Sequence, residues 1–505
     1  MTFTRFALLG ALACFALPAQ AQSPRAEART AQRMESLRGN TPALYAFLRQ
    51  MPKGGDLHSH LGGAVYSESF LRWAAEDGGC VTTRSPGVVA PPCAQDSTRV
   101  RATRALDDQA LYDAVIDATS MRNWPPANGA GHDHFFETFA HLDATSRRTG
   151  DMVAEVAQRA ADGKVAYLEL MNTFEGRSVG ALAAASGYRD DWAALRDTMF
   201  TLGLERVVQQ ARAQIDSIEA RRDTVLHCGT AAARPGCAVT VRWIYQVLRA
   251  GAPAQVFGQM LLGLRLAEVD SRVVSINLVQ PEDWRVPMQD YSLHMRMLQW
   301  LRQRYPKTKL TLHAGELAAG LVPPEGLRFH VREAVEVAGA QRIGHGVSVM
   351  YEDHPDALLA EMAKRQVMVE INLTSNDGIL GVRGADHPLR SYLAAGVPVA
   401  LSTDDEGVNR SEMTQEYLRA VRDQGLSYQV LKRMARTSLQ FAFVEGASLW
   451  QDFARLKSVA ACGGVLGGMQ SARCAAYVAA NPRARLQWQL ERDFSTFESS
   501  ATTTR

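Results

Sequence analysis

The sequence predicts an α/β fold, a (β/α)8 TIM-type barrel, and two observations lead to this prediction. Short, nearly continuous apolar stretches alternate with helical stretches over most of the chain, as in a parallel sheet that is buried on both faces. Eight such strand candidates are present, and a number near eight favours a closed barrel over an open sheet. We also expect an N-terminal helical extension, loop insertions and C-terminal helices around the barrel.

The first residues have the pattern of a signal peptide. Arg5 supplies a positive charge, residues 6–17 form an apolar run too short to span a membrane, and Ala19-Gln20-Ala21 is a small-x-small cleavage site. We therefore expect residues 1–21 to be removed and the protein to be exported, either to a periplasm or out of the cell. Cys14 leaves a lipoprotein signal open as an alternative.

The remaining chain divides into three predicted parts. Residues 22–50 are a helical extension with helices at 26–37 and 41–50, residues 51–440 are the barrel, and residues 441–505 are a helical cover with a disordered tail from Ser495. Residues 78–103, which are rich in Pro and Gly, are expected to be an inserted loop. A second loop is expected at 123–131.

The elements of the barrel follow from the apolar pattern in chain order. The expected strands lie around Leu57 and at 165–170, 259–266, 273–278, 309–313, 342–345, 367–373 and 397–403. The expected helices lie at 107–119, from near His134, and at 151–161, 192–218, 239–250, 291–305, 327–338, 356–364 and 388–395. The link at 267–272 is too short for a helix, so one strand beside it is open to reassignment.

Six cysteines remain after the signal peptide, and they fall into three close pairs. An exported chain with an even number of locally paired cysteines predicts three disulfides, each worth about 2–3 kcal/mol by the chain-entropy estimate. Free buried thiols are the alternative, and a zinc ribbon is not predicted because no pair has Cys-x-x-Cys spacing. The pairs are Cys80/Cys93, Cys228/Cys237 and Cys462/Cys474.

The stretch KLTLHAGE at 309–316 organises the predicted site. His313 ends a buried strand, and Gly315 lets the chain turn so that Glu316 can point into the same space. His58 and His60 lie two residues apart on another strand and project to one face. Asp404 ends the last strand, which neighbours the first in a closed barrel. Three histidines and one carboxylate at the carboxyl mouth are a suitable ligand set for one zinc ion.

The neighbouring polar residues predict hydrolytic chemistry. Zinc lowers the pKa of a bound water from about 15.7 to about 7. His345 and Asp405 are placed to orient that water and take its proton, and Glu316 is placed to protonate the substrate. Other histidines are expected to be structural or solvent-exposed: His132, His134, His141, His227, His294, His330, His354 and His387.

Several segments together resemble the adenosine deaminase family, in the same order along the chain and over roughly residues 50–440. They are MPKGGDLHSHLGGA, LTLHAGE, RIGHGV, INLTSN and HPLRSYLAAGVPVALSTDD, and the MPKG segment with a signal peptide is most similar to the family's secreted, growth-factor-like branch. The resemblance implies a (β/α)8 barrel with zinc held by His58, His60, His313 and Asp404. It also implies that Glu316 protonates the purine ring, that His345 and Asp405 handle the hydroxide, and that ammonia leaves from C6.

Three positions depart from the family pattern. Gly62 stands where the family has an aspartate that contacts the ribose, and Gln280 replaces a glycine of the turn that meets the purine. The second strand reads Glu169-Leu170-Met171 instead of Glu-x-Arg. We expect substrate to contact His60, Gly62, Gln280 and Asp405.

The predicted function is zinc-dependent deamination of adenosine and 2′-deoxyadenosine, with a small purine nucleoside as the binding partner. A net charge of +2 on 505 residues gives no indication of a nucleic-acid partner, and no later apolar run is long enough for membrane insertion. Two alternatives stay open. One is a related amidohydrolase acting on another aminopurine or modified nucleoside, and the other is a catalytically idle secreted binding protein of the same fold. The oligomeric state is open, with a homodimer as one option.

Overall fold

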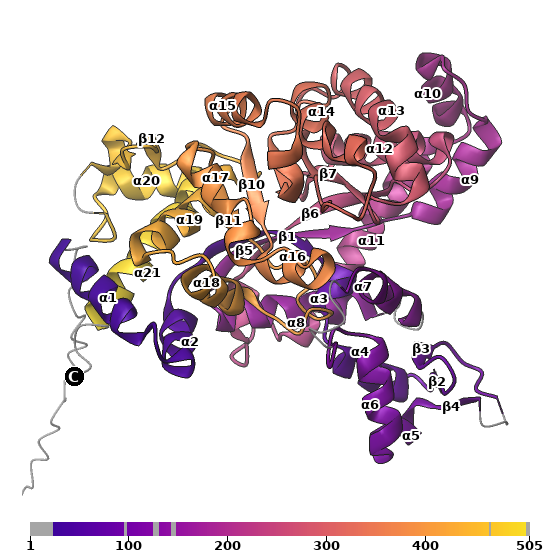
Figure 1. Ribbon diagram of the computed structural model, residues 1–505, viewed down its shortest axis with the longest axis horizontal. Coiled ribbons are helices and arrows are strands. Elements are labelled where there is room, and N and C mark those ends of the chain that lie inside the picture. Colours follow the sequence, from indigo (N-terminus) through magenta and orange to yellow (C-terminus); the bar gives the residue numbers. More distant parts are fainter. Residues whose placement is uncertain (1–23, 95–97, 125–130, 143–147, 464–465, 501–505) are drawn as a thin grey trace, which may run out of the picture.

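The centre of the computed structural model is an eight-stranded parallel sheet in the order β1-β5-β6-β7-β8-β9-β10-β11 (Figure 1). Residues 24–94, 98–124, 131–142, 148–463 and 466–500 are described. Neighbours in the sheet follow each other in this series along the chain and pair in parallel, as in a singly wound barrel. The strands are β1 (Gly54–His60), β5 (Val165–Asn172), β6 (Thr240–Leu248), β7 (Val273–Val279), β8 (Lys309–Ala314), β9 (Arg342–His345), β10 (Met368–Ile371) and β11 (Val399–Leu401).

The sheet closes where the residues after β11 meet β1. The backbone N–H of Asp404 donates to the carbonyl of His58 (2.8 Å), and the N–H of His60 donates to the carbonyl of Asp404 (3.0 Å). Asp404 also forms an isolated parallel bridge with Ser59. These bonds confirm the predicted (β/α)8 barrel and place the first and last strands side by side at its carboxyl end.

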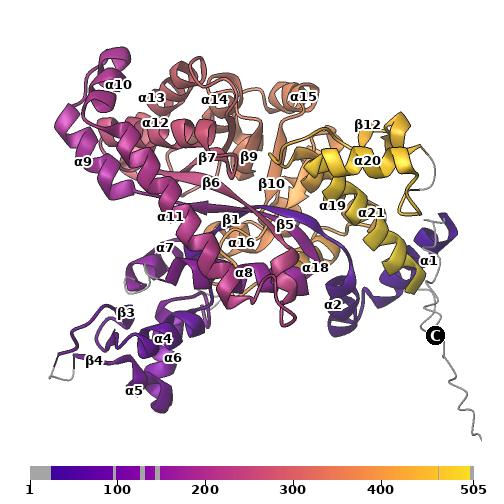
Figure 2. The same ribbon diagram turned by 180° about the vertical axis from the view of Figure 1, so that it is seen from behind.

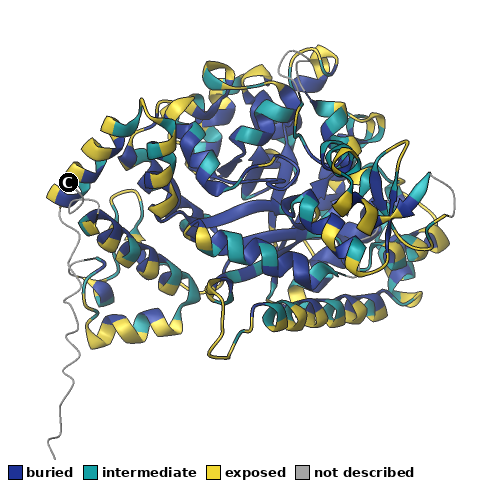
Figure 3. Ribbon diagram, turned by 90° about the horizontal axis from the view of Figure 1, so that it is seen from below, coloured by how far each residue is buried: buried dark blue, intermediate teal, exposed yellow. Residues whose placement is uncertain are grey.

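Helices surround the barrel, with their inner faces buried and their outer faces exposed (Figures 2 and 3). Buried aliphatic and aromatic side chains of strands and helices form one continuous core between the two layers. The surrounding helices are α8 (Thr149–Asp162), α9 (Gly176–Ser186), α10 (Trp192–Thr201), α11 (Leu204–Val225), α12 (Pro253–Val269), α13 (Arg285–Arg302), α14 (His330–Glu336), α15 (Pro355–Arg365), α16 (Leu373–Leu380), α17 (Leu389–Ala394), α18 (Met413–Arg422) and α19 (Tyr428–Phe441).

Two predicted elements are wrong: a strand lies where a helix was predicted, and a helix lies where the next strand was predicted. Residues 239–250, predicted as a helix, contain strand β6, and residues 259–266, predicted as a strand, lie inside helix α12. Helix α12 is buried over most of its surface, so its sequence lacks the polar face that marks a helix. The predicted helix at 192–218 is two helices, α10 and α11, which meet at Gly203 with φ 110°.

The insertion after β1 is folded, although residues 78–103 were predicted to be a loop. After the short helix α3 (Leu61–Ala64), a three-stranded antiparallel sheet packs on helices around Leu71, Val81 and Val88. Figure 1 shows this unit projecting from the barrel. Three-residue strands are too short to show an alternating pattern in sequence. Its elements are α4 (Ser67–Glu76), β2 (Cys80–Thr82), β3 (Gly87–Val89), β4 (Arg99–Arg101), α5 (Ala102–Asp107) and α6 (Gln109–Ala118).

Helix α7 (His132–Thr138) follows the insertion and brings the chain back to the barrel. It carries the aromatic side chains that were expected on a helix beginning near His134. Most of the loop expected at 123–131 lies outside the described residues, as does the predicted signal peptide.

The two ends of the described chain lie together. Helices α1 (Pro24–Leu37) and α2 (Thr41–Gln50) pack near α21 (Pro482–Ser500), where the rings of Phe47 and Phe497 are 5.2 Å apart. The hairpin β12 (Trp450–Asp452) and β13 (Lys457–Ser458) and helix α20 (Ala472–Ala480) complete the cover.

The prediction that the tail is disordered from Ser495 is wrong for residues 495–500. These residues continue α21, and Ser495, Phe497 and Glu498 are buried. A buried ion pair of 2.5 Å between Lys432 and Glu498 holds the end of the helix. The Ser/Thr-rich composition gave no indication of these anchoring side chains. Residues 501–505 lie outside the described chain.

The three predicted disulfides are present: Cys80–Cys93, Cys228–Cys237 and Cys462–Cys474. Each closes a short loop on the surface of a different part of the fold. Across the described residues, no helix combines the length and the apolar character needed to cross a membrane.

Candidate metal and catalytic site

Four side chains converge at the carboxyl end of the barrel. Nε2 of His313 lies 3.1 Å from Nε2 of His58 and 3.2 Å from Nε2 of His60. Oδ1 of Asp404 lies 3.3 Å from each of the Nε2 atoms of His58 and His60. Ligands held at zinc-nitrogen distances in a tetrahedron are separated by about 3.3–3.4 Å. Four of the six separations among these atoms are therefore close to the spacing of donor atoms that share one metal ion.

The hydrogen bonds of the three imidazoles show which ring atoms are free. Nδ1 of His58 contacts Oε2 of Glu370 (2.6 Å), Nδ1 of His60 contacts Oε1 of Gln246 (2.6 Å), and Nδ1 of His313 contacts Oδ1 of Asn277 (2.9 Å). Because each partner atom is an acceptor, each Nδ1 carries a proton, and in the neutral ring that binds a metal each Nε2 presents its lone pair. Three lone pairs and a carboxylate facing one point repel each other unless a cation lies between them.

Two further observations support a cation at this point. Oδ1 of Asp404 is buried and has no hydrogen-bond donor among the described residues. The carboxylates of Asp404 and Glu370 outweigh the effect of burial and raise the pKa of His58 to about 10. Although burial opposes it, the rings of His58 and His60 hold the pKa of Asp404 well below its usual range. The residues present therefore fit a divalent metal ion.

His58 is held by a buried chain of charges that crosses the barrel. The second oxygen of Glu370 accepts from Arg342 Nε (2.6 Å) and from the hydroxyl of Thr311 (2.7 Å). Arg342 in turn donates to Glu169 (2.5 Å), one of the residues in the unusual Glu169-Leu170-Met171 segment. Ion pairs this deeply buried need complete hydrogen bonding, and this chain supplies it.

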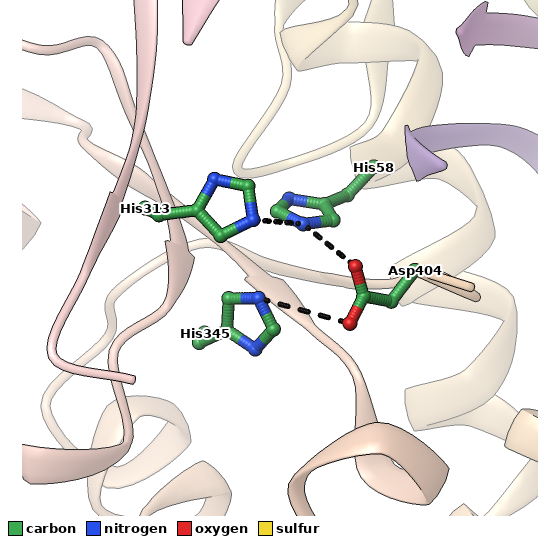
Figure 4. Close-up of side chains that lie close together, drawn as sticks. All are labelled: His58, His313, His345 and Asp404. Atoms are coloured by element: carbon green, nitrogen blue, oxygen red, sulfur yellow. Dashed lines mark hydrogen bonds and ion pairs between the residues drawn. The ribbon is translucent and has the colours of Figure 1, made fainter. Parts of the chain in front are cut away.

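His345 lies beside this set without being part of its shortest contacts. Nε2 of His345 is 3.9 Å from Oδ2 of Asp404, which also accepts from Ser375 Oγ (2.6 Å). Figure 4 shows His58, His313, His345 and Asp404 turned toward a common centre. Two overlapping groups are close enough for metal binding: His58, His313, His345 and Asp404, and His60, Asp404 and Asp405. The shorter distances favour His60 over His345 as the third imidazole.

Glu316 and Asp405 border the same centre as buried acids. Burial raises the pKa of Glu316 well above its usual value, and the charge of Asp404 adds to the effect. Burial and the charge of Asp404 also raise the pKa of Asp405 well above its usual value. Burial lowers the pKa of His345 to about 3, although Asp404 opposes the shift. The site thus combines a carboxyl group whose pKa is raised with an imidazole whose pKa is lowered.

The loop that carries Glu316 is tied to the loop after the preceding strand, β7. The carboxylate of Glu282 accepts from the backbone N–H groups of Gly315 (3.0 Å) and Glu316 (2.8 Å). Burial alone would raise the pKa of Glu282, but the hydrogen bond with His330 and nearby charges lower it to about 2. An ionised carboxylate therefore fixes the turn at Gly315, whose φ is 72°.

Two glycine positions behave differently from each other. A Cβ at Gly63 would collide with the carboxylate of Asp405, so only glycine lets this carboxylate approach the backbone. A Cβ at Gly62 would meet nothing within 4 Å. A Cβ could therefore be added at Gly62 without displacing a neighbour.

Gln280 keeps the backbone conformation expected of the glycine that it replaces, with φ 82°. Its side-chain oxygen accepts from the N–H of Ala250 (2.9 Å), and its carbonyl accepts from Arg249 Nε (2.9 Å). The side chain is therefore engaged with the β6–α12 loop, while the residue still borders the cavity described next.

A cavity of about 320 Å³ opens beside the polar centre. One wall is polar, and the other is formed by aromatic and aliphatic side chains of α7 and of the loops after β6 and β7. The lining residues include His60, Gly62, Gln280, His313, Glu316, Asp404, Asp405, Phe135, Phe136, Phe139, Leu248 and Trp284. A larger hollow of about 970 Å³ at the amino end of the barrel contains none of the predicted site residues.

All predicted site residues are thus brought together at one end of the barrel. Sequence reasoning missed their supports: Glu370, Gln246, Ser375 and Glu282. Two histidines that were expected to be structural also lie in these supports, because His330 binds Glu282 and His387 binds Asn376. The motifs INLTSN and HPLRSY contained this signal, since their polar residues follow strand β10 toward the site.

A buried histidine–carboxylate cluster at the carboxyl mouth of a (β/α)8 barrel defines a protein of the metal-dependent barrel class. Residues 208–449 match the family model described as adenosine deaminase, and this match supports the resemblance to the adenosine deaminase family.

The relatives match over a limited region. An adenosine deaminase of Escherichia coli (strain SE11) is 38% identical over 136 residues, which is 27% of this chain and 38% of the relative. An adenosine deaminase of Shewanella denitrificans is 34% identical over the same shares. The chain thus matches well under two thirds of the length of these curated relatives.

Solved structures support the fold. An amidohydrolase from Burkholderia ambifaria with bound Zn has a TM-score of 0.55 and 17% identity, over 92% of this chain and 95% of that one. Adenine deaminase from Arthrobacter aurescens has a TM-score of 0.50 and 19% identity, over 78% and 94%. N6-methyl-AMP deaminase from Arabidopsis thaliana has a TM-score of 0.50 and 22% identity, over 79% and 94%.

Proposed function

We propose that this protein is a metal-dependent hydrolase that deaminates adenosine and 2′-deoxyadenosine to inosine and 2′-deoxyinosine, releasing ammonia. The observation that carries the proposal is the convergence of three imidazole lone pairs and one carboxylate oxygen beside Glu316, His345 and Asp405. A binding protein without catalysis would have no need for a buried carboxyl group with a raised pKa next to such a set.

His58, His60, His313 and Asp404 would hold the metal, which we propose to be one zinc ion per chain. When bound, zinc supplies a water molecule of lowered pKa as a nucleophile at neutral pH. The nitrogen-rich ligand set with one carboxylate suits zinc, and Glu370, Gln246 and Asn277 hold the three imidazoles in the tautomer that binding requires.

Glu316 would act as the general acid. Its raised pKa favours the protonated form, and its loop is fixed by Glu282. It would deliver its proton to the purine ring nitrogen as the nucleophile attacks C6. His345 and Asp405 lie on the metal side of the cavity, where they would orient the attacking water and receive its proton.

The cavity supports a neutral ligand of nucleoside size. Its aromatic wall can stack on a purine, and its volume of about 320 Å³ lies at the lower end of the range for small-molecule sites. Among the described lining residues there is no lysine or arginine to pair with a phosphate, whereas Glu316, Asp404 and Asp405 contribute negative charge. His60, Gly62, Gln280 and Asp405 would contact the substrate.

A second candidate is a related amidohydrolase that acts on another aminopurine. The altered Gly62 and Gln280 positions favour it, and the structures with a similar fold include an adenine deaminase and an N6-methyl-AMP deaminase. Ammonia release from zinc-reconstituted protein should be measured with adenosine, 2′-deoxyadenosine, adenine, AMP and N6-methyl-AMP. Turnover of adenosine above all others supports the first candidate, and preference for a different compound supports the second.

The idle binding protein is separated from both by the same experiment. Such a protein would bind zinc and a purine but release no ammonia from any compound. We further propose export to a periplasm or the extracellular space, which is supported by the three disulfides and by the predicted signal peptide. Membership in the growth-factor-like branch rests on the MPKG segment and the predicted signal peptide alone.

A further inference from the structure

A chain of three buried hydrogen bonds leads from the backbone to His345. The N–H of Leu389 donates to Nδ1 of His387 (3.1 Å). Nε2 of His387 lies 3.0 Å from Oδ1 of Asn376, and Nδ2 of Asn376 lies 2.9 Å from Nδ1 of His345. All three side chains are buried, so water does not compete for these contacts.

The polarity of this chain is fixed at its backbone end. A backbone N–H can only donate, so Nδ1 of His387 is an acceptor and carries no proton. The proton of His387 therefore lies on Nε2 and is donated to Asn376 Oδ1. Burial, with Arg419 nearby, lowers the pKa of His387 to about 4, in keeping with a neutral ring.

Asn376 continues the same direction of hydrogen-bond donation toward the site. With its oxygen occupied by His387, the amide group turns its NH2 toward Nδ1 of His345, which must accept. The single proton of His345 then lies on Nε2. Nδ2 of Asn372 is 3.4 Å from both ring nitrogens of His345, so it favours neither tautomer.

The backbone at His345 is held by the same segment. His345 has φ 68°, and Gly346 follows with φ 60°. The hydroxyl of Tyr392, on α17, donates to the carbonyl of Gly346 (2.6 Å). The segment from His387 to Tyr392 thus fixes both the ring and the turn, and it directs Nε2 toward Oδ2 of Asp404.

We propose that Asn376 and His387 are positioning residues that hold His345 as its Nε2–H tautomer, so that His345 donates a hydrogen bond at the reactive centre. The consequence for catalysis rests on the proposed deaminase function, whereas the tautomer does not.

The tautomer can be observed directly. Neutron diffraction from deuterium-exchanged crystals of the zinc-reconstituted protein should show deuterium on Nε2 of His345 and on Nε2 of His387, with none on the Nδ1 atoms. Deuterium on Nδ1 of His345 would overturn the proposal. This measurement needs no variant and no turnover, so a failure of the deaminase assay counts against the proposed function and leaves this test intact.

Asn376→Asp reverses the direction of the hydrogen bond to His345 while keeping a side chain of nearly the same shape. A carboxylate accepts from both neighbours, so it draws a proton onto Nδ1 of His345. We expect zinc content and KM to stay near the wild-type values, kcat to fall about 10–100-fold, and the neutron map to show deuterium on Nδ1 of His345. Zinc retention with unchanged kcat and an unchanged tautomer would contradict the proposal.

The matched control is Asn40→Asp. Asn40 caps helix α2 with its side-chain oxygen, far from the site, and aspartate caps equally well. This variant makes the same chemical change and should keep the wild-type kcat and tautomer. If Asn376→Asp does not fold, the neutron map of the wild-type protein still decides the question.

Discussion

Nδ1 of His58 lies 2.6 Å from Oε2 of Glu370, and this contact connects the predicted metal site to a buried chain of charges. Because Glu370 also binds Arg342, its carboxylate is ionised and keeps the proton of His58 on Nδ1. Burial would raise the pKa of Glu370, but Arg342 and His58 lower it. Nε2 is therefore the His58 atom that faces a metal ion, which would take the place of the proton on that nitrogen.

Glu370→Gln should weaken zinc binding by about 10–100-fold, the usual effect of losing a hydrogen-bond partner of a metal-binding histidine. The amide removes the charge that orients His58 but keeps the shape. Competition with a chromophoric chelator measures the affinity. Glu361→Gln, on the exposed side of α15, is the control and should leave the affinity unchanged.

The purified protein should bind one zinc ion per chain. His58→Ala, His60→Ala and His313→Ala should each lose both metal and activity, since each removes one of four ligands. Metal analysis by mass spectrometry, together with ammonia release, tests this. His354→Asn changes an exposed histidine and should retain both. Full activity in a metal-free preparation would contradict the assignment.

Glu316→Gln should keep zinc and lower kcat by roughly 10²–10⁴-fold, the typical contribution of general acid catalysis. Because only protonated Glu316 can donate, activity should fall on the alkaline side as pH rises through its raised pKa. A variant that loses zinc instead would show that Glu316 is a ligand.

None of the six cysteines after the predicted signal peptide should react with a thiol reagent in denatured, unreduced protein. Each disulfide closes a loop of 9 to 13 residues, so each should contribute about 2–3 kcal/mol to the free energy of unfolding. Reduction should lower the Tm accordingly. Peptide mapping that finds any of these cysteines free would refute the scheme.

The fifth prediction concerns the sugar. Gly62 supplies no carboxylate to the 5′ hydroxyl, and a hydrogen bond to a charged group is worth about 1.5–3 kcal/mol. The preference in kcat/KM for adenosine over 5′-deoxyadenosine should therefore stay below about a hundredfold. Gly62→Asp has room for its Cβ and should raise the preference by roughly tenfold or more.

Gly62→Ala is the matched control, because it adds a Cβ without a carboxylate. It should leave the preference between the two nucleosides unchanged. A strong preference in the wild-type protein would mean that another residue holds the hydroxyl.

The barrel and its site residues were predictable because strand ends and motifs are local features. His58, His313 and Asp404 each lie where an apolar stretch stops, and in a parallel barrel such points meet at one end. The exchange of β6 and α12 shows the limit, since a helix buried on all sides has no polar face to reveal its period.

The supports of the site could not be predicted in the same way. Gln246 is 186 residues from His60, and Glu370 is 312 residues from His58, so only the closed fold brings them into contact. The direction of the chain from Leu389 to His345 depends on which atom of each side chain faces its neighbour. A sequence pattern does not contain that information.

The closure of the barrel by Asp404 has a consequence for biosynthesis. Its backbone pairs with His58 and His60, and its side chain completes their ligand set, so the first and last parts of the barrel join at one residue. A ribosome or a translocation pore releases the chain from its amino end. The proposed metal site therefore cannot be completed until almost 350 residues beyond the two histidines have left the ribosome or the pore. The metal ions present in the compartment where the final strand emerges then determine which ion can bind.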